Sequence, residues 1–267
     1  GPIVMEAQKL GIPTYIHEQN AFPGVTNKLL AKKADTVFLA FEEAKKHLPE
    51  GCRCEVVGNP VRQSFLTATR ADARKKLGLD GNFTVFSVGG SLGANKINEM
   101  AADLMAWHGK EGKINHIHGF GKHGRENFPK MLEERGVDLK KCPRIRAMEY
   151  IDQMELCMTA ADLIISRAGA ITISELEVVG KASILVPYPY AAENHQYHNA
   201  KVLEDHGAAI LIEEKDYNRD AFLEKVRELS ADPARTEALG RNAASLAVYD
   251  TAERICHSIL AGLGRGK

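Results

Sequence analysis

The stretch FTVFSVGGSLGANKINEMAADLMAW, residues 83–107, indicates the fold class of this 267-residue chain. Its first six residues are apolar or β-branched except for one serine, which is typical of a buried strand. A glycine-rich turn follows, and then a run with apolar residues at helical spacing. A strand that passes through such a turn into a helix begins a βαβ unit, so we expect a parallel sheet.

The same alternation continues on both sides of this stretch. Strands and helices alternate from residue 13 to residue 58 and again from residue 83 to residue 212, and helical sequence follows residue 219. GNPVR, residues 58–62, separates the two series, because its glycine and proline do not fit a regular element. The chain is therefore predicted to be α/β, with one complete Rossmann-like domain preceded by the second half of another. Predicted boundaries are 1–62, 63–245 and a C-terminal helix, 246–267, that packs back on the first part.

Composition restricts the classes of function. Lys plus Arg equals Asp plus Glu at 35 each, so no global field draws the chain to nucleic acid. There is no apolar run near the ~18 residues of a membrane span. Five scattered cysteines indicate a reducing compartment, and the spacing of Cys52 and Cys54 does not suit a zinc site. The first residues, GPIVMEAQKLG, begin within a helix pattern, so we expect upstream sequence of about 100 residues, half a typical domain.

Loops after the strands should carry the chemistry, because ligands of open α/β sheets bind at the carboxyl ends of strands. After residue 88, glycines and Ser91 form either a ligand loop or only a tight turn, and their spacing matches neither a P-loop nor a dinucleotide fingerprint. In SRAGAITISE, residues 166–175, Gly169 and Ala170 permit close approach to a helix N-terminus. Glu175, placed in the first turn, either complements the helix dipole or accepts bonds from two ribose hydroxyls.

Three further clusters are candidates. Polar residues 17–20 follow a strand. Arg62 lies at the hinge, where it could pair with phosphate or with a carboxylate. Residues 194–198 place several amide and imidazole side chains in one loop. In residues 116–124, a phosphate or sugar contact from His118 or Lys122 is favoured over a zinc site with His116 and His123. No Ser–His–Asp or Cys–His pair stands out. Glycine-rich loops, helix N-termini and one placed glutamate together indicate a nucleotide-diphosphate site, best suited to a nucleotide sugar.

Five motifs, in this order, make the chain resemble the MurG family of bacterial N-acetylglucosaminyltransferases: HEQNAFPGVTNKLLAKKAD, GNPVR, GGSLGANKIN, SRAGAITISE and ENHQYHNA. The resemblance implies a GT-B fold of two facing Rossmann-like domains. It implies inverting transfer of GlcNAc from UDP-GlcNAc to undecaprenyl-pyrophosphoryl-MurNAc-pentapeptide, which converts lipid I to lipid II in peptidoglycan synthesis. Neither metal nor cofactor nor nucleic acid is expected, and the location implied is peripheral, on the cytoplasmic face of the cell membrane.

The resemblance also implies roles for particular residues. Ser91 matches the serine of the glycine-rich loop, Ile151 the residue whose backbone meets the uracil, and Glu175 the ribose contact. Gln196 matches the residue that reads the sugar hydroxyls. The full set of implied donor contacts is Asn20, Arg62, Ser91, Ile151, Ala170, Ile171, Thr172, Ile173, Ser174, Glu175 and Gln196, with weaker candidates Gly90, Gly93, His118, Lys122, Gly169 and Asn194.

The sequence departs from the family pattern at several positions, and these departures leave other functions open. The family's GGTGGH-type loop, whose histidine is a candidate catalytic base, is not in this sequence, so the catalytic residue is unassigned and His17 or Glu18 could only support it. Positions 119 and 120 also differ from the family. We therefore expect donor binding with poor turnover. The alternatives are another GT-B enzyme, such as a UDP-sugar epimerase, or a non-catalytic nucleotide-sugar-binding module; a dehydrogenase is disfavoured by the glycine spacing.

Overall fold

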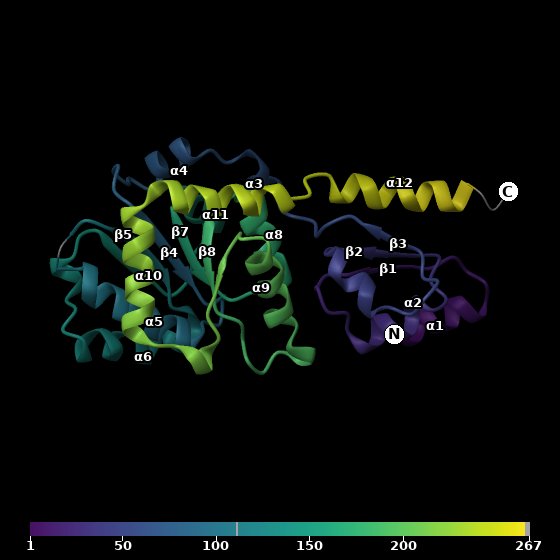
Figure 1. Cartoon of the computed structure of the whole chain (residues 1–267), viewed down its shortest axis with the longest axis horizontal. Coiled ribbons are helices and arrows are strands. Elements are labelled where there is room, and N and C mark those ends of the chain that lie inside the picture. The colour runs from purple at the N-terminus through teal and green to yellow at the C-terminus, as the bar shows by residue number, and fades with distance from the viewer. Residues whose placement is uncertain (111, 265–267) are drawn as a thin grey trace.

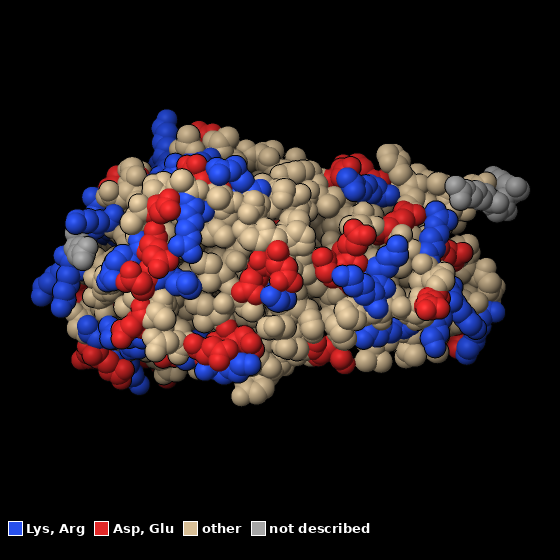
Figure 2. Space-filling view, in the orientation of Figure 1, with Lys and Arg blue, Asp and Glu red and all other residues tan. Residues whose placement is uncertain are grey.

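The chain folds around two parallel sheets that lie side by side along its long axis (Figure 1). The computed structural model describes residues 1–110 and 112–264. The first sheet has three strands and the second has six. Within the described residues, no helix combines the length and apolar character needed to cross a bilayer. On the face seen in Figure 2, Lys and Arg are interspersed with Asp and Glu, so no broad surface of one sign forms there.

Strands and helices alternate through most of the chain. The strands are β1 Tyr15–Glu18, β2 Thr36–Leu39, β3 Cys54–Val56, β4 Thr84–Val88, β5 Asn115–Gly119, β6 Ile145–Met148, β7 Leu163–Ser166, β8 Ala182–Leu185 and β9 Ile210–Leu211. The α-helices are α1 Pro2–Lys9, α2 Val25–Ala31, α3 Gln63–Thr67, α4 Arg70–Lys76, α5 Asn95–His108, α6 Gly121–Glu134, α7 Met154–Ala160, α8 Ala170–Val179, α9 His195–Asp205, α10 Arg219–Ala231, α11 Pro233–Leu246 and α12 Thr251–Gly264. Short 3₁₀ turns η1 Glu42–His47, η2 Leu139–Lys141, η3 Ala192–Asn194 and η4 Glu214–Asp216 complete the order.

The larger sheet has the strand order β6-β5-β4-β7-β8-β9 with every pair parallel. The chain therefore starts in the middle at β4, winds outward to β6, returns to β7 beside β4, and winds outward the other way. This is the doubly wound order, and its switch point lies between β4 and β7. The predicted α/β class and parallel sheet are confirmed.

Two cores cover the two faces of the larger sheet. Along β4, Val85 packs into the core under α5 and α10, whereas Phe86 packs into the core under α7, α8 and α9. Because successive side chains of a strand point to opposite faces, a strand buried on both sides needs apolar residues throughout. This explains why residues 83–88 are mostly apolar and show no alternation with exposed polar residues; Thr84 and Ser87 are themselves buried.

Several local predictions need correction. Helix α6 already begins at Gly121, so His123, which was considered from the sequence as a zinc ligand, lies in the first turn of a helix. In the alternating series of residues 13–58, the segment Glu42–His47 forms a 3₁₀ turn and not an α-helix. The N-terminal helix forms, but Ile3 and Leu10 of its apolar face are 85% and 76% exposed. Hydrophobic spacing indicated the helix correctly, yet it could not show which side chains find a neighbour to pack against.

The segment between the sheets is held by the C-terminal part of the chain. Gly58 has a φ of +76°, and a Cβ there would lie 2.7 Å from Cβ of Val248. The Thr251 hydroxyl donates to the Val57 carbonyl oxygen at 2.7 Å. At the far end of α12, a Cβ at Gly262 would collide with the hydroxyl of Tyr15 in β1. The helix therefore starts against the linker and reaches the first sheet (Figure 1).

His108 at the end of α5, His116 and His118 in β5, and Ser87 in β4 form a buried chain of hydrogen bonds. The Asn98 amide nitrogen donates to the Phe120 carbonyl, so its Oδ1 faces Nε2 of His118 at 3.2 Å. With this assignment of the Asn98 amide, His118 Nε2 donates, Ser87 donates to His118 Nδ1, and His116 donates to Ser87; His118 Nδ1 also lies 3.1 Å from the Ser87 carbonyl oxygen. His108 Nε2 donates in turn to His116 Nδ1 at 3.1 Å. Each imidazole is thus bonded as a neutral tautomer.

Burial lowers the pKa of all three imidazoles, to about 4 for His108, to about 3 for His118, and well below the usual value for His116. A histidine whose folded pKa is depressed contributes to stability above its unfolded pKa of about 6.5, and this contribution falls as the pH drops. Buried glutamates with raised pKa values have the opposite effect on the pH dependence of stability. The contribution of one histidine is therefore measured by comparing a single-site variant with the native chain.

We expect His108→Gln to make the protein relatively more stable in acid. A glutamine amide can still donate to His116, but it does not titrate. Between about pH 7.5 and 5.5, the free energy of unfolding of the variant relative to the native chain should rise by about 1 kcal/mol. Urea unfolding at both pH values measures this difference. His257→Gln, in the partly exposed helix α12, is the control and should show no such change; an unchanged difference for His108→Gln would contradict the neutral chain.

Candidate functional site

A pocket of about 210 Å³ opens at the carboxyl ends of the strands in the larger sheet. It brings together five of the predicted residues: Arg62, Gly90, Ser91, Ile151 and Glu175. They come from the hinge, from the loops after β4 and β6, and from the helix after β7. Residues far apart in the sequence meet here because parallel strands end at the same edge, and the pocket spans the switch point between β4 and β7.

Glu175 is the buried carboxylate of this pocket. It is the sixth residue of α8, so the prediction that it lies in the first turn is wrong. The helix begins at Ala170, because Gly169 already has the extended conformation of an N-cap. Burial raises the pKa of Glu175 to about 7, and the guanidinium of Arg62, 3.9 Å away, opposes this rise. A carboxylate one turn inside the helix faces the pocket and does not cap the helix.

The N-terminus of α8 is open. No side chain caps it, and the first intrahelical bond runs from the Ile173 N–H to the Gly169 carbonyl. The N–H groups of Ala170, Ile171 and Thr172 therefore lack intrahelical acceptors. Three such groups together with the helix dipole make a binding position for an anion such as a diphosphate.

Two residues of the predicted 170–175 segment do not face this position. Ile173 is fully buried in the core of the sheet, and Ser174 accepts a hydrogen bond from the Asn59 amide at 3.2 Å. The helical period turns their side chains inward while Ile171 and Thr172 stay accessible. The side chains of Ile173 and Ser174 are therefore not available to the donor, and a contact through their backbone stays a prediction.

The glycine-rich loop after β4 serves two purposes. Gly90 has a φ of +87° with open space around its Cβ position, and it lines the pocket. Gly93, at φ +83°, packs against the protein itself, since a Cβ there would lie 2.2 Å from the Phe120 carbonyl oxygen. Only Gly90 gives clearance to a ligand, so the weaker prediction that Gly93 contacts the donor is not supported. Ser91 is exposed and lies four residues before the helix.

The two glycines give a matched pair of substitutions. Gly90→Ala should lower the free energy of unfolding by about 1 kcal/mol, because alanine is strained in the left-handed region. Gly93→Ala should lower it by at least about 2 kcal/mol, since it adds a collision with backbone to the same strain. Chemical denaturation measures both values. Equal losses for the two variants would contradict the close contact at Gly93.

Residues 17–20 from the first sheet are engaged with their own loop. The Glu18 carboxylate accepts from the Asn20 N–H and side-chain amide, from the Gly24 N–H and from the Asn27 amide. His17 Nε2 lies 2.9 Å from the Gly58 carbonyl. These contacts order the 18–27 loop against the hinge. They leave His17 and Glu18 as positioning groups, not as free acids or bases.

Asn20 and Gln196 lie outside the pocket. The Asn199 amide donates to Asn20 Oδ1 and accepts from the Ala21 N–H, so it joins the first sheet to α9. Gln196 Oε1 accepts from the Tyr188 N–H, which closes the 188–196 loop and leaves its NH₂ group available. Asn194 is exposed with a φ of +51° just before α9.

The histidines of residues 116–124 do not line the pocket. His118 is 0% exposed and bonded to Ser87 and Asn98, so the prediction that it contacts a phosphate or sugar is wrong. Lys122 is exposed in α6 and does not line the pocket. Across the part of the chain that the structure describes, no three His, Cys, Asp or Glu side chains are grouped so that they could hold a metal.

Other pocket residues were missed from the sequence. They are Val88, Gly119, Glu149, Tyr150, Asp152 and Met154. Most follow the carboxyl ends of β5 and β6, and the position of EYID directly after a strand was the available signal. At Gly119 a Cβ would lie 2.8 Å from Cγ1 of Ile151, so this glycine makes room for the isoleucine.

Comparisons with known proteins agree with this architecture. Residues 84–255 match the glycosyltransferase family 28 C-terminal domain, and residues 1–39 match the glycosyltransferase family 28 N-terminal domain.

The chain belongs to glycosyltransferase family 28.

A curated relative from Acetivibrio thermocellus is 40% identical over 256 residues, 96% of this chain and 68% of the relative. It is named UDP-N-acetylglucosamine--N-acetylmuramyl-(pentapeptide) pyrophosphoryl-undecaprenol N-acetylglucosamine transferase. The crystal structure of Acinetobacter baumannii MurG superimposes with a TM-score of 0.80 at 29% identity, covering 98% of this chain and 70% of that one. The resemblance to the MurG family and the GT-B fold are thereby confirmed, and the chain is a glycosyltransferase.

A UDP-GlcNAc 2-epimerase from Neisseria meningitidis shares the fold, with a TM-score of 0.68 at 13% identity, covering 97% of this chain and 72% of that one. Similarity at this level of identity concerns the fold alone.

Proposed function

We propose that this family 28 chain transfers GlcNAc from UDP-GlcNAc to undecaprenyl-pyrophosphoryl-MurNAc-pentapeptide, the step from lipid I to lipid II in peptidoglycan synthesis. The observation that carries the proposal is the meeting of Arg62, Ser91, Ile151 and Glu175 in one pocket beside the open N-terminus of α8. The printed name of the Acetivibrio thermocellus relative supports the same donor and acceptor. The proposed boundaries remain 1–62, 63–245 and 246–267.

The pocket suits the nucleotide end of the donor. Its volume of about 210 Å³ is below the roughly 300–1,000 Å³ usual for whole ligands, so it takes only part of UDP-GlcNAc. In the proposed pose the uracil meets the backbone of Ile151 and the ribose hydroxyls donate to Glu175. The diphosphate lies at the first turn of α8 with Arg62 and Ser91 beside it. The sugar then extends toward Asn20 and Gln196.

This pose accounts for the chemistry of the leaving group. In inverting transfer, the acceptor hydroxyl attacks the anomeric carbon and the bond to the diphosphate breaks. Negative charge grows on the departing phosphate oxygens, and prearranged N–H groups and a guanidinium stabilise it without reorganisation. Arg62 is 60% exposed at its side chain, so it can move from Glu175 toward the phosphates when the donor binds.

The proposal includes a peripheral position on the cytoplasmic face of the cell membrane, where the lipid-linked acceptor lies. Exposed apolar side chains on neighbouring helices of the first part support it: Ile3 and Leu10 at α1, and Val25 and Leu29 in α2. The Gln8 amide in α1 donates to the Leu30 carbonyl in α2, so these helices are in contact. An apolar surface of this kind fits the interface of a bilayer.

A transfer assay tests the function directly. Incubated with radiolabelled UDP-GlcNAc and lipid I in detergent, the chain should move label into the lipid fraction slowly, as poor turnover requires, and in proportion to added lipid I. Omitting lipid I is the control. Conversion of UDP-GlcNAc into an epimer without lipid I would favour an epimerase. Tight UDP-GlcNAc binding without either reaction would favour a binding module.

Glu175→Gln should weaken UDP-GlcNAc binding by about 1–3 kcal/mol, because a hydroxyl donates more strongly to a carboxylate than to an amide. Isothermal titration calorimetry measures the loss. Glu177→Gln is the matched control, since Glu177 is also buried in α8 but does not line the pocket. Equal affinities for the native chain and Glu175→Gln would remove Glu175 from the ribose position.

The same pair of variants gives a pH signature. Only ionised Glu175 accepts from both ribose hydroxyls, and its pKa is raised to about 7. Affinity for UDP-GlcNAc should therefore be constant above that pH and fall about tenfold between pH 8 and pH 6 as the carboxylate takes up a proton. Glu175→Gln should lose this dependence, and Glu177→Gln should keep it.

A further inference from the structure

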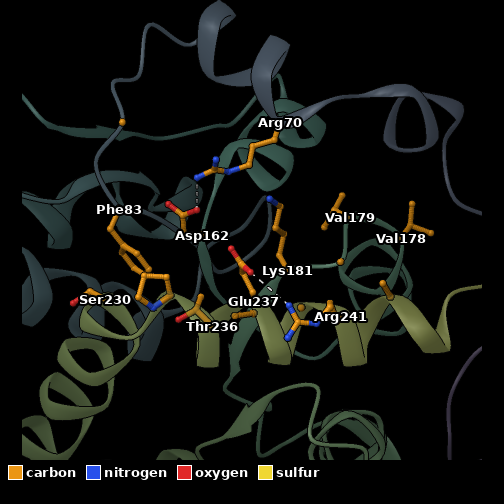
Figure 3. A pocket seen from close by; sticks show the side chains of 16 residues that line it. Arg70, Phe83, Asp162, Val178, Val179, Lys181, Ser230, Thr236, Glu237 and Arg241 are labelled. Atoms are coloured by element: carbon orange, nitrogen blue, oxygen red, sulfur yellow. Dashed lines mark hydrogen bonds and ion pairs between the residues drawn. The ribbon is translucent and has the colours of Figure 1, made fainter.

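A second cavity, of about 720 Å³, opens at the opposite edge of the larger sheet (Figure 3). It lies at the amino ends of the strands, where Phe83, Asp162 and Lys181 precede β4, β7 and β8. The end of α8 and one side of α11 form its walls. Its size is within the range of pockets for small molecules, and none of its residues takes part in the proposed donor site.

Lys181 is the distinctive group in this cavity. Figure 3 shows its side chain reaching between the Arg70–Asp162 pair and the Glu237–Arg241 pair. Among residues 1–110 and 112–264, its ammonium group has neither a hydrogen bond nor an ion pair. A partly buried lysine without a partner is unfavourable unless something else supplies the counter-charge.

The nearby carboxylate of Asp162 is already occupied. Its Oδ1 accepts from Arg70 at 2.6 Å, and its Oδ2 lies 3.4 Å from Arg74 and 2.9 Å from the Thr84 N–H. Glu237 is 3.5 Å from Arg241. The lining therefore holds three cationic side chains against two carboxylates, and the unmatched charge is that of Lys181.

The other polar groups restrict the kind of anion. Ser230 and Thr236 donate their hydroxyl protons to the carbonyls of Arg227 and Leu229, so neither is free to donate to a ligand. Asp232 caps the N-terminus of α11 with its own carboxylate, which excludes an anion from that helix end. Arg70 and Arg241 already face carboxylates, so Lys181 is the cation left to pair, and one cation matches a single carboxylate better than a phosphate dianion.

The remaining wall is apolar. Phe83, Val178, Val179, Pro233 and Ala244 line the cavity beside the charged groups. A ligand that satisfies both parts has one negative charge and a hydrocarbon body. Its negative charge would pair with Lys181, and its hydrocarbon body would shield the apolar side chains of the wall from water.

We propose that this cavity is a binding site for a small carboxylic acid with an apolar body, held by a charge-assisted hydrogen bond from Lys181. The site is independent of the proposed transferase function. One structural link joins them: α8 carries Glu175 as its sixth residue and ends at Val179, on the wall of this cavity.

Electrostatics supply a signature for the site. The pKa of Lys181 is lowered to about 8, chiefly by burial and also by the charges of Arg70 and Arg74, while Asp162 opposes the change. Glu237 and Arg241 face the cavity from α11. A bound carboxylate favours the charged lysine, so binding should strengthen as the pH falls through about 8 and should take up protons near that pH.

The experiment titrates the full chain with octanoate by calorimetry at pH 7 and pH 9, with UDP present to occupy the donor site. We expect saturable binding at pH 7 that weakens several-fold at pH 9. Lys181→Met should weaken it at least about tenfold, while Lys181→Arg should retain it. Lys225→Met, at a partly buried lysine of α10 outside the cavity, is the matched control and should bind like the native chain.

Several results would overturn the proposal. These are the absence of saturable octanoate binding, equal affinity of Lys181→Met and the native chain, or displacement of octanoate by UDP. Octylamine provides a test on the native chain alone, independent of whether the variants fold. If it binds as well as octanoate, only an apolar surface is present and the charge assignment is wrong.

Discussion

The parallel pairing of β4 with β7 is the constraint on which the rest of this structure depends. Crossover connections between parallel strands are right-handed. The chain winds outward from β4 in one direction and from β7 in the other, so the connections that follow these two strands lie on opposite faces of the sheet. The loops after β4 and β6 and the helix after β7 then leave a space at the carboxyl edge. Arg62, Ile151 and Glu175 meet in that space although they are distant in the sequence.

Helix α8 extends this constraint to both ends of the sheet. Its N-terminus is uncapped beside the proposed donor position, and its C-terminus ends in Gly180, in the left-handed conformation, beside the second cavity. Two carboxylates on this helix, Glu175 and Glu177, have raised pKa values because they are buried. Buried ionisable groups that oppose stability are typical of functional sites, and Glu175 has a pocket that explains its burial.

Much of the fold could be predicted because its signals are local. Continuous apolar runs gave the central strands, and glycine-rich turns gave the strand-to-helix junctions. The errors arise where a side chain depends on its neighbours. The sequence predicts Glu175 in the first turn because Gly169 and Ala170 both resemble loop residues. A helix that starts one residue earlier is rotated by about 100° at each position, which changes the side chain that faces the pocket. The sequence predicts a ligand contact for His118, whereas in the structure Ser87 and Asn98 bond its imidazole within the core.

The sequence by itself determined the α/β class, the parallel strands, the resemblance to the MurG family and the loops in which the site would lie. These follow from short-range patterns of apolar residues, glycines and motif order, which need no knowledge of contacts. Only the tertiary structure decided which residues of those loops share a pocket, which glycines admit a ligand, and that Lys181 has no partner among the described residues. The physical reason is that burial, hydrogen-bond partners and charge balance are properties of groups brought together by packing.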